Sequence, residues 1–325
     1  MKTKILTKLT ESNNYISGQE LCAEFGVSRT AVWKVMNQLK EEGYVIESIP
    51  NKGYKLVSKP DILSKNEIES GLHTNWAGKK LYYFEETGST NDDAKRFAAQ
   101  GDAHGTLVVS DKQNAGRGRR GREWVSIKGD NVYFSIVLRP DMSPAKASML
   151  TLVMALAVAN AICDVTGLCA RIKWPNDIVV NRKKVCGMLT EMTAELAYIH
   201  EVVIGVGINI NQVDFPDEIK ETASSLYLES GQKIMRSKLL QSCITYFERY
   251  YDLFMQTQEL SGLMEEYNAM LVNLDAGVKV LDPKGEFQGI SRGIDAQGQL
   301  LVEHDGVTEA VYAGEVSVRG FYGYV

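Results

Sequence analysis

A run of glycine and arginine, GRGRRGR at residues 116–122, cannot form part of a packed core or of a regular helix interior. Glycine lets the backbone turn sharply and approach a ligand closely. Arginine donates paired hydrogen bonds to phosphate or carboxylate groups. The run therefore predicts a mobile loop that closes over an anionic ligand. A solvated basic loop is the alternative, and the run by itself does not separate the two.

Two familiar phosphate-binding motifs are excluded at this loop. A Walker P-loop requires Gly-Lys-Ser/Thr at a fixed spacing, and none follows. The spacing of Gly116, Gly118 and Gly121 matches the dinucleotide-binding fingerprint, but arginines fill the intervening positions and no apolar helix follows. We therefore expect the loop to act through its own charge and flexibility.

Charge is unevenly spread along the 325 residues. The net charge of the chain is −5, whereas residues 1–60 carry nine lysines and arginines against six acidic residues, which leaves −8 on the remainder. A positive head on an acidic body predicts a nucleic-acid partner for the head only.

The cysteines and the hydrophobic runs exclude several classes of protein. Five cysteines without a C-x-x-C pair argue against a disulfide or zinc framework. The N-terminus leads into a polar segment and not into a signal sequence. The longest uncharged run, residues 147–163, contains polar side chains and is interpreted as a buried helix, too short and too polar to span a bilayer. We expect a cytoplasmic protein with no membrane partner.

The head has the helical pattern of a helix-turn-helix domain. Helices are predicted at 2–10 and 19–25, and Gly26 opens a tight turn. A third helix is predicted from Arg29 to about residue 42, with Ser28 as its N-cap and an apolar face at helical spacing. The polar face of this third helix is the candidate recognition surface.

A predicted hairpin follows the third helix and completes a winged helix. Strand patterns at 44–46 and 54–56 flank a turn at 50–53. We expect the third helix to dock in a major groove, and a symmetric dimer to bind a two-fold operator. A winged helix used only for protein contacts is the alternative. The residues expected to contact DNA are Ser28, Arg29, Thr30, Trp33, Lys34, Asn37, Lys52 and Lys55.

Residues 65–271 predict a mostly antiparallel sheet with helices packed against it. Glycines alternate with apolar residues at 205–209, and glycines inside a strand often mark the close approach of a ligand or another backbone. The predicted strands lie at 80–86, 106–111, 132–138, 178–180, 185–190 and 202–209, and the predicted helices at 64–70, 92–100, 144–163, 236–257 and 259–270.

Residues 272–325 predict a small SH3-like β-barrel, because short strand patterns are separated by glycine-containing turns. Its role is left open between a stabilising cap and the binding of a partner protein or nucleotide. The predicted strands lie at 278–281, 287–294, 300–303, 308–312 and 315–319, with turns at 283–285, 296–298 and 304–306.

Five short motifs together resemble those of the bifunctional biotin–protein ligases and biotin-operon repressors of bacteria, and the resemblance covers nearly the whole chain. The motifs are STN at 89–91, GRGRRG at 116–121, KWPND at 173–177, KVCG at 184–187 and GVGIN at 205–209. The resemblance implies an α+β multidomain fold. Its parts are a winged helix, a mixed or antiparallel central sheet like that of class II aminoacyl-tRNA synthetases, and an SH3-like barrel.

The resemblance also implies an activity and partners. Biotin is joined to AMP from ATP with Mg²⁺, and biotin then passes to one lysine of an acceptor such as a biotin carboxyl carrier protein. The adenylate would be a corepressor that promotes a homodimer on operator DNA of biotin genes. The residues implied at the biotin or adenylate site are Ser89, Thr90, Asn91, Gln113, Gly116, Arg117, Gly118, Arg119, Trp124, Lys173, Asn176, Lys184, Gly187, Gly205, Gly207 and Asn209.

These residues suit that chemistry. Attack of a carboxylate on the α-phosphate brings two anions together, and Lys184 and Arg117 can neutralise both, so they are the expected catalytic groups. Mg²⁺ would arrive with ATP, and no protein side chain is assigned to it. Ordering of residues 113–124 would exclude water from the mixed anhydride, with Trp124 closing on the adenine or the sheet.

Three other functions remain open on the sequence. A lipoate–protein ligase shares the core fold, but GRGRRG and the winged helix are typical of the biotin family. A ligand-sensing repressor without catalysis is disfavoured by intact Arg117, Lys184 and Asn176. A ligase that no longer represses is disfavoured, more weakly, by the complete wing and recognition helix.

Overall fold

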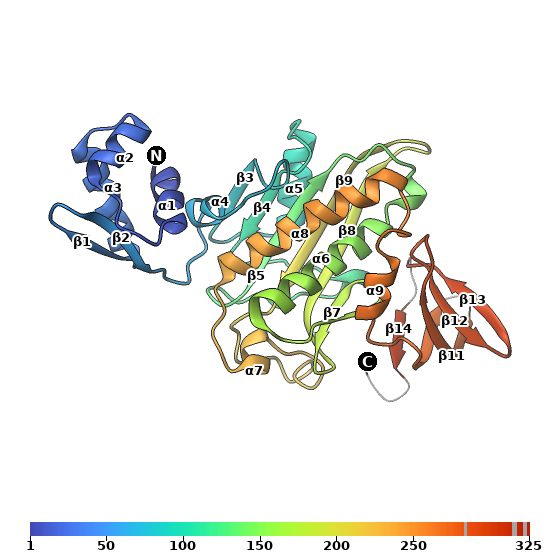
Figure 1. Cartoon of the computed structure of the whole chain (residues 1–325). Coiled ribbons are helices and arrows are strands. Elements are labelled where there is room, and N and C mark those ends of the chain that lie inside the picture. The colour runs from blue at the N-terminus through green and yellow to red at the C-terminus, as the bar shows by residue number, and fades with distance from the viewer. Residues whose placement is uncertain (283–284, 314–316, 321–323) are drawn as a thin grey trace. The chain divides into compact units, whose positions relative to one another are not determined.

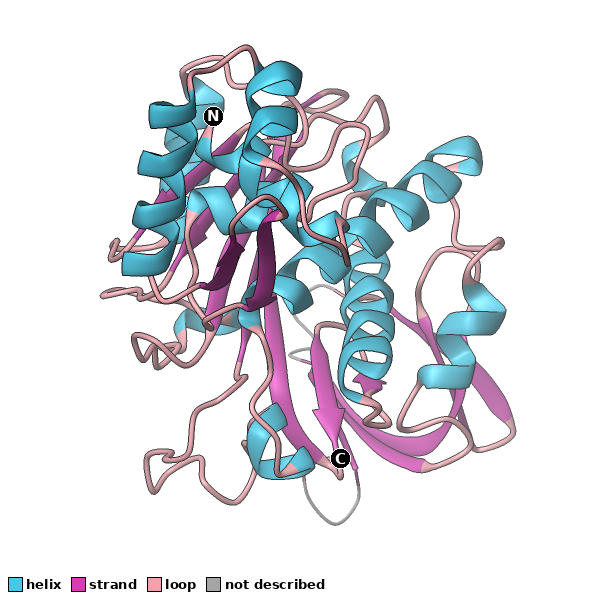
Figure 2. Ribbon diagram, turned by 60° about the vertical axis from the view of Figure 1, so that its left-hand side comes forward, coloured by secondary structure: helices cyan, strands magenta, loops and turns pink. Residues whose placement is uncertain are grey.

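The structure is a computed structural model that describes residues 1–282, 285–313, 317–320 and 324–325. The chain divides into two compact units, Met1–His73 and Thr74–Val325. Figure 1 labels their elements, and Figure 2 distinguishes helices, strands and loops by colour.

The N-terminal unit is a winged helix-turn-helix, as predicted. Its helices α1 (Lys2–Glu11), α2 (Gly18–Phe25) and α3 (Arg29–Glu41) precede the antiparallel hairpin of β1 (Val45–Ile49) and β2 (Gly53–Ser58). The Ser28 hydroxyl caps α3 by accepting a hydrogen bond from the Ala31 N–H (3.2 Å). Gly26 ends α2 at φ 64°, a left-handed conformation that costs glycine little.

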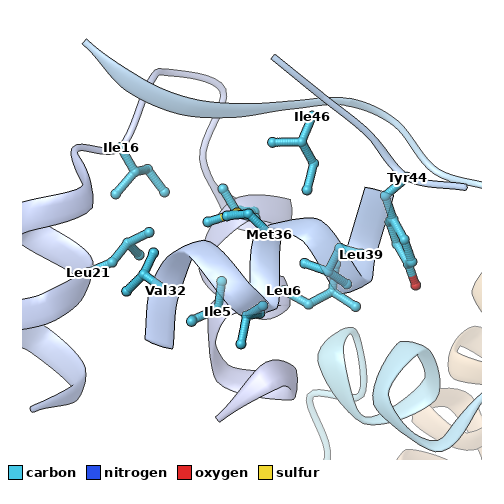
Figure 3. Packing of buried hydrophobic residues seen from close by; sticks show 11 residues of the cluster. Ile5, Leu6, Ile16, Leu21, Val32, Met36, Leu39, Tyr44 and Ile46 are labelled. Atoms are coloured by element: carbon cyan, nitrogen blue, oxygen red, sulfur yellow. The ribbon is translucent and has the colours of Figure 1, made fainter. Parts of the chain in front are cut away.

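One hydrophobic core joins these helices to the wing. The predicted apolar face of α3 is buried, and it includes Val32, Met36 and Leu39. Figure 3 shows Ile46 of the wing pointing toward Met36, with Leu6 of α1 below them. Burial of this face leaves the opposite side of α3 in solvent.

A fourth helix, α4 (Lys65–Ser70), also belongs to the N-terminal unit. Thr3 donates a hydrogen bond to Asn66 (2.8 Å), and the Tyr44 hydroxyl donates to Glu67. These contacts extend the N-terminal unit beyond residue 60, so that it ends at His73. Sequence patterns had placed this helix at the start of the body, because a six-residue helix carries little information about its packing partner.

The second unit is built on a seven-stranded sheet in the order β3-β4-β5-β9-β8-β7-β6. β3 and β4 pair in parallel, and the other neighbours pair antiparallel. The mostly antiparallel sheet is therefore confirmed. The bounds are β3 (Leu81–Phe84), β4 (Leu107–Ser110), β5 (Val132–Leu138), β6 (Arg171–Lys173), β7 (Asp177–Val180), β8 (Lys183–Ala194) and β9 (Ile199–Ile208).

Helices cover this sheet. α5 (Thr90–Ala99) packs Phe97 against Val108 and Val203 of the sheet. α6 (Met149–Thr166) and α8 (Arg236–Thr257) lie side by side (Figure 1). The remaining helices are α7 (Leu226–Ser230), which the sequence patterns missed, and α9 (Met264–Met270), which is shorter than predicted.

Helix α6 corrects one sequence argument. Residues 144–166 contain an 18-residue window with a mean hydropathy of 1.9, and by length and composition alone they could cross a membrane. The statement that this segment is too short and too polar was therefore too strong. The predicted burial is nevertheless confirmed, because 72% of the apolar window lies inside the protein, as in the core helix of a globular domain.

The C-terminal strands form a five-stranded antiparallel sheet in the order β13-β12-β11-β10-β14. The Trp174 indole N–H donates to the Gly298 carbonyl (3.1 Å) and ties this sheet to the core. The predicted turn at 283–284 and the predicted strand residues 315–316 lie outside the described residues. The bounds are β10 (Gly277–Asp282), β11 (Gly285–Ile294), β12 (Leu300–His304), β13 (Val307–Val311) and β14 (Ser317–Gly320).

Candidate functional site

A cavity of about 50 Å³ lies between the arginine loop, the N-terminus of α5 and strands β8 and β9. Most of the predicted biotin-site residues surround it. They are Ser89, Thr90, Asn91, Gln113, Arg117, Gly118, Arg119, Trp124, Asn176, Lys184, Gly187, Gly205 and Gly207.

Sequence reasoning missed three lining residues, Met188, Leu189 and Val206. Met188 and Val206 adjoin predicted glycines in sequence, and Leu189 lies opposite Gly205 where β8 pairs with β9. Strand adjacency was the signal that could have found them. It was overlooked because apolar strand residues are more often core.

The start of α5 presents a cluster of hydroxyl and amide groups to the cavity. The Thr90 N–H and hydroxyl both donate to Gln113 Oε1, at 2.8 and 3.0 Å. Ser135 of β5 was not predicted, yet its buried hydroxyl lies 2.8 Å from Thr90 Oγ1 and 2.6 Å from Asn91 Oδ1. This wall of the cavity is polar but uncharged.

The side chain of Asn91 explains why residue 205 of β9 is glycine. A Cβ atom at Gly205 would lie 2.1 Å from Asn91 Oδ1, so only glycine leaves room for the asparagine side chain. Asn91 Nδ2 donates to Glu191 (2.7 Å), which also binds Lys95 (2.9 Å). The close approach predicted at this glycine is thus made by a side chain of the chain itself.

The position of Trp124 explains why residues 187 and 207 are glycine and why the cavity is small. A Cβ atom at Gly187 or Gly207 would lie 2.7 or 2.6 Å from the indole, which therefore rests on bare strand backbone. Its Nε1 is buried without a hydrogen-bond partner among the described residues. Pockets for drug-sized ligands are usually about 300–1,000 Å³, so the indole fills the space in this conformation.

Arg117 holds the loop to α5 through an exposed ion pair. Its guanidinium donates to both carboxylate oxygens of Asp92, at 2.8 and 2.6 Å. The loop also closes on itself, because the Trp124 N–H donates to Gly116 O (2.9 Å). The Arg117 and Asp92 side chains are 41% and 51% exposed, so water competes for this pair.

Arg119 lies deeper and links the loop to the C-terminal sheet. Its guanidinium donates to Asn176 Oδ1 (3.0 Å) and to the Ala313 carbonyl (3.1 Å). Burial lowers the pKa of Arg119 from its usual value, although it remains a cation at neutral pH. Asn176 in turn donates to the Met188 carbonyl (2.9 Å), which fixes its orientation.

Lys184 faces the cavity from β8 and pairs with a buried carboxylate. Its Nζ lies 2.6 Å from Asp177 Oδ1 and 5.4 Å from the centre of the Trp124 ring. Although burial opposes it, the positive charges of Lys184 and Lys173 hold the pKa of Asp177 below its usual value. Burial lowers the pKa of Lys173 to about 8, against the opposing attraction of Asp177.

Three predicted site residues do not line the cavity. Lys173 is buried beneath it beside Asp177, and Gly116 contributes its backbone to the loop hydrogen bond with Trp124. Asn209 is turned away, because its side-chain amide donates to the Ser224 carbonyl (3.1 Å). It anchors the segment that follows β9 and is not placed to touch a ligand in the cavity.

The outward face of α3 is the second candidate surface. Trp33 is 56% exposed, and Thr30 and Lys34 beside it also face solvent. Lys52 and Lys55 of the wing both lie 5.9 Å from the centre of the Tyr15 ring. Ser28 is occupied as the α3 cap. The unit therefore presents cations and one exposed indole on the recognition helix and wing.

A metal site was also sought among the acidic, histidine and cysteine side chains. Within the described part of the chain, no three of them gather closely enough to hold a metal ion.

Comparison with known proteins decides the family. The chain is 41% identical over 308 residues to the bifunctional ligase/repressor BirA of Bacillus subtilis (strain 168), a match that covers 94% of each chain. It is 31% identical over 317 residues to the protein of the same name from Escherichia coli (strain K12), covering 97% of this chain and 96% of that one. The chain belongs to the BirA family of bifunctional biotin ligases and repressors.

Family models match the three parts of this BirA-family chain. The biotin/lipoate A/B protein ligase family matches residues 83–209, which hold most of the cavity. A helix-turn-helix domain matches residues 2–55, and the biotin protein ligase C-terminal domain matches residues 274–319. The predicted ligase and repressor halves are therefore both confirmed at the level of family.

A solved structure supports the same assignment for the second unit. The biotin protein ligase from Aquifex aeolicus in complex with biotin and ATP is 30% identical, with a TM-score of 0.66. The match covers 74% of this chain and 99% of the Aquifex chain. Among the alternatives left open by the sequence, a biotin–protein ligase is thus the one that is shown.

Proposed function

We propose that this BirA-family chain forms biotinyl-AMP in the cavity beneath the arginine loop, transfers biotin to an acceptor lysine, and represses transcription as an adenylate-bound dimer. Residues 74–271 would carry the chemistry, residues 272–325 would complete the site, and the N-terminal unit, Met1–His73, would bind DNA. The observation that carries the proposal is the arrangement of Arg117, Arg119 and Lys184 around one cavity.

The first step joins two anionic reactants, so it needs cations that neutralise their charge. A carboxylate oxygen of biotin attacks the α-phosphorus of ATP, the bond to the β-phosphate oxygen breaks, and pyrophosphate leaves. Both reactants are anions, so their approach is opposed in water. Lys184 and Arg117 would neutralise them, and cations placed where charge develops stabilise the transition state most.

The second step needs a neutral amine and an intact anhydride. The Nζ of the acceptor lysine attacks the acyl carbon, the bond to AMP breaks, and the amine releases a proton to solvent as the amide forms. Arg119, which is already held by Asn176 and Ala313, would stabilise the departing AMP. No side chain of this chain acts as the nucleophile in either step.

The neutral wall of the cavity would select biotin. Ser89, Thr90, Asn91 and Gln113 offer hydroxyl and amide groups, which can pair with the polar ring of biotin without an uncompensated charge. The relative from Aquifex aeolicus is described with biotin and ATP bound. We propose that this chain takes the same two substrates.

Ligand entry would require Trp124 to move. The indole lies on the strand backbone at Gly187 and Gly207, and the remaining cavity is far smaller than a nucleotide. An ordered loop above the adenylate would then exclude water, which destroys a mixed anhydride. Mg²⁺ would enter on the phosphates of ATP and screen their charge.

The repressor half of the proposal rests on the N-terminal unit. The positive charge of residues 1–60 and the polar face of α3 suit a major groove flanked by phosphates. One such unit reads a single half-site, so a dimer on a two-fold operator would supply the needed affinity. The proposed use of ATP and DNA supports a cytoplasmic location for this activity.

One experiment tests both halves. Purified protein is given ATP, Mg²⁺ and either biotin or lipoate, and pyrophosphate exchange is followed. The same mixtures are then run in a gel shift on the chain's own upstream DNA. We expect biotin-dependent exchange and tighter DNA binding with biotin plus ATP. Lipoate-dependent exchange would overturn the substrate, and unchanged DNA binding would overturn the corepressor role.

A further inference from the structure

We propose that Tyr324 is a positioning residue for Lys184: it keeps Asp177 partnered, so that Lys184 can release this carboxylate and turn to the phosphates of ATP. The inference rests on the proposed adenylation in the cavity. It adds Tyr324, from outside the motifs, to a site that the sequence motifs confine to residues 89–209.

Tyr324 contacts two buried charged residues next to the cavity, Asp177 and Lys173. Its hydroxyl donates a hydrogen bond to Asp177 Oδ2. The other carboxylate oxygen, Oδ1, is the one that pairs with Lys184 at 2.6 Å. Tyr324 and Lys184 therefore hold the two oxygens of one carboxylate. Burial, and then the neighbouring Asp177 carboxylate, raise the pKa of Tyr324 well above its usual value, so the hydroxyl stays a donor.

The ring of Tyr324 contacts the second cation of this group. Lys173 Nζ lies 4.1 Å from the centre of the ring, within the range of a cation–π interaction. Lys173 is buried on β6, and β6 pairs with β7 so that Lys173 lies opposite Asp177. Tyr324 thus contacts both the Asp177 carboxylate and the Lys173 ammonium group. Its neighbour is also held, because Arg182 donates to the Val325 carbonyl.

This arrangement answers an electrostatic problem in the proposed reaction. Lys184 cannot hold Asp177 and neutralise ATP with equal strength. A buried carboxylate that loses its cation is costly unless other groups satisfy it. Lys173 and the Tyr324 hydroxyl remain beside Asp177 when Lys184 leaves. They therefore lower the cost of the exchange that ATP binding requires.

The first test compares Tyr324→Phe with Tyr312→Phe. Tyr312 is an exposed tyrosine near the end of β13 and serves as the matched control. Removal of the Tyr324 hydroxyl leaves Asp177 more dependent on Lys184. We expect the KM for ATP in adenylate formation to rise on the order of ten- to a hundredfold, the effect of one lost hydrogen bond to a charged group. The dissociation constant for biotin without ATP should stay within twofold.

A double-mutant cycle shows whether Tyr324 acts through Asp177. On an Asp177→Asn background the carboxylate charge is gone, so Tyr324→Phe should change the ATP KM by less than twofold. If Asp177→Asn does not fold, Tyr324→Leu replaces this arm. Because it loses the ring on Lys173 as well, it should raise the ATP KM more than Tyr324→Phe.

The outcomes separate the inference from the reaction on which it depends. An unchanged ATP KM in Tyr324→Phe, with wild-type adenylation intact, overturns the inference and leaves the proposed function standing. The same holds if biotin affinity and the melting temperature fall together with ATP binding, which is the signature of a purely structural role. A wild-type protein that forms no biotinyl-AMP overturns the proposed function and this inference together.

Discussion

Two carboxylate–cation pairs border the same cavity and differ in burial. Asp92 and Arg117 make a two-pronged pair whose side chains are 51% and 41% exposed. Asp177 and Lys184 are 11% and 27% exposed, and Asp177 has Lys173 and Tyr324 beside it. Exposed pairs are worth little and exchange readily. Buried pairs are expensive to break. By this comparison the first pair can open and close with the loop, whereas the second can open only because Lys173 and Tyr324 stay beside Asp177.

The largest expected difference between the pairs is in catalysis. Lys184→Ala should slow adenylate formation by about 10²–10³-fold, the usual cost of removing a preorganised charge from a reaction centre. Arg117→Ala should cost about tenfold, because water and Arg119 can partly replace an exposed guanidinium. Single-turnover formation of biotinyl-AMP measures both. Near-normal turnover in Lys184→Ala, with an unchanged melting curve, would show that the anion partner is elsewhere.

The same contrast applies to stability. Asp177→Ala should lower the free energy of unfolding by about 3–5 kcal/mol, because it leaves the buried Lys173 and the partly buried Lys184 without their carboxylate. Asp92→Ala should lower it by less than about 1 kcal/mol. Urea unfolding of the two variants beside wild type measures the difference. Equal losses would contradict the distinction between an exposed and a buried pair.

A pH series sharpens the role of the buried pair. The pKa of Lys173 is about 8 in the folded chain and about 10.4 in an unfolded one. Between these values the unfolded state binds more protons, so wild-type stability should rise with pH relative to Lys173→Met. The full gain is about 3 kcal/mol by pH 10.5, and none is expected below pH 7. Denaturant unfolding of both proteins at pH 7, 8.5 and 10 tests this sign. A difference independent of pH would show that Lys173 titrates normally.

The smallest effect concerns the exposed pair and the loop it holds. In the ligand-free protein, Arg117→Ala should speed hydrogen exchange at the Gly118 and Trp124 amides by about two- to fivefold, since at most about 1 kcal/mol is lost. Bound biotinyl-AMP should protect both amides far more strongly in wild type. Equal protection with and without the adenylate would mean that residues 113–124 are not a ligand-ordered lid.

Local patterns made the head largely predictable. Ser28 as an N-cap and Gly26 as a helix end are short-range features, and each was found where the sequence placed it. The apolar face of α3 follows from helical spacing alone. The limits of that approach appear at α4, where a short helix packs on α1 and the reason lies in contacts more than sixty residues apart.

The site was predictable as a set of motifs but not as a geometry. GRGRRG, KVCG and GVGIN identified the family and most of the cavity wall. The glycines of β9 were expected to admit a ligand or a backbone, yet Gly205 and Gly207 admit the side chains of Asn91 and Trp124. Asn209 was counted with its motif, although its amide is turned to the Ser224 carbonyl. Motif membership does not state which way a strand residue faces.

The sequence by itself therefore determined the family, the winged helix and the residue types that line the cavity, because those properties depend on residue types at short spacings. Only the tertiary structure decided which carboxylate each cation meets. Asp177 and Tyr324 are 147 positions apart and touch because the C-terminal residues return to the edge of the seven-stranded sheet. Contacts of that kind are set by strand order and register, which no local pattern contains.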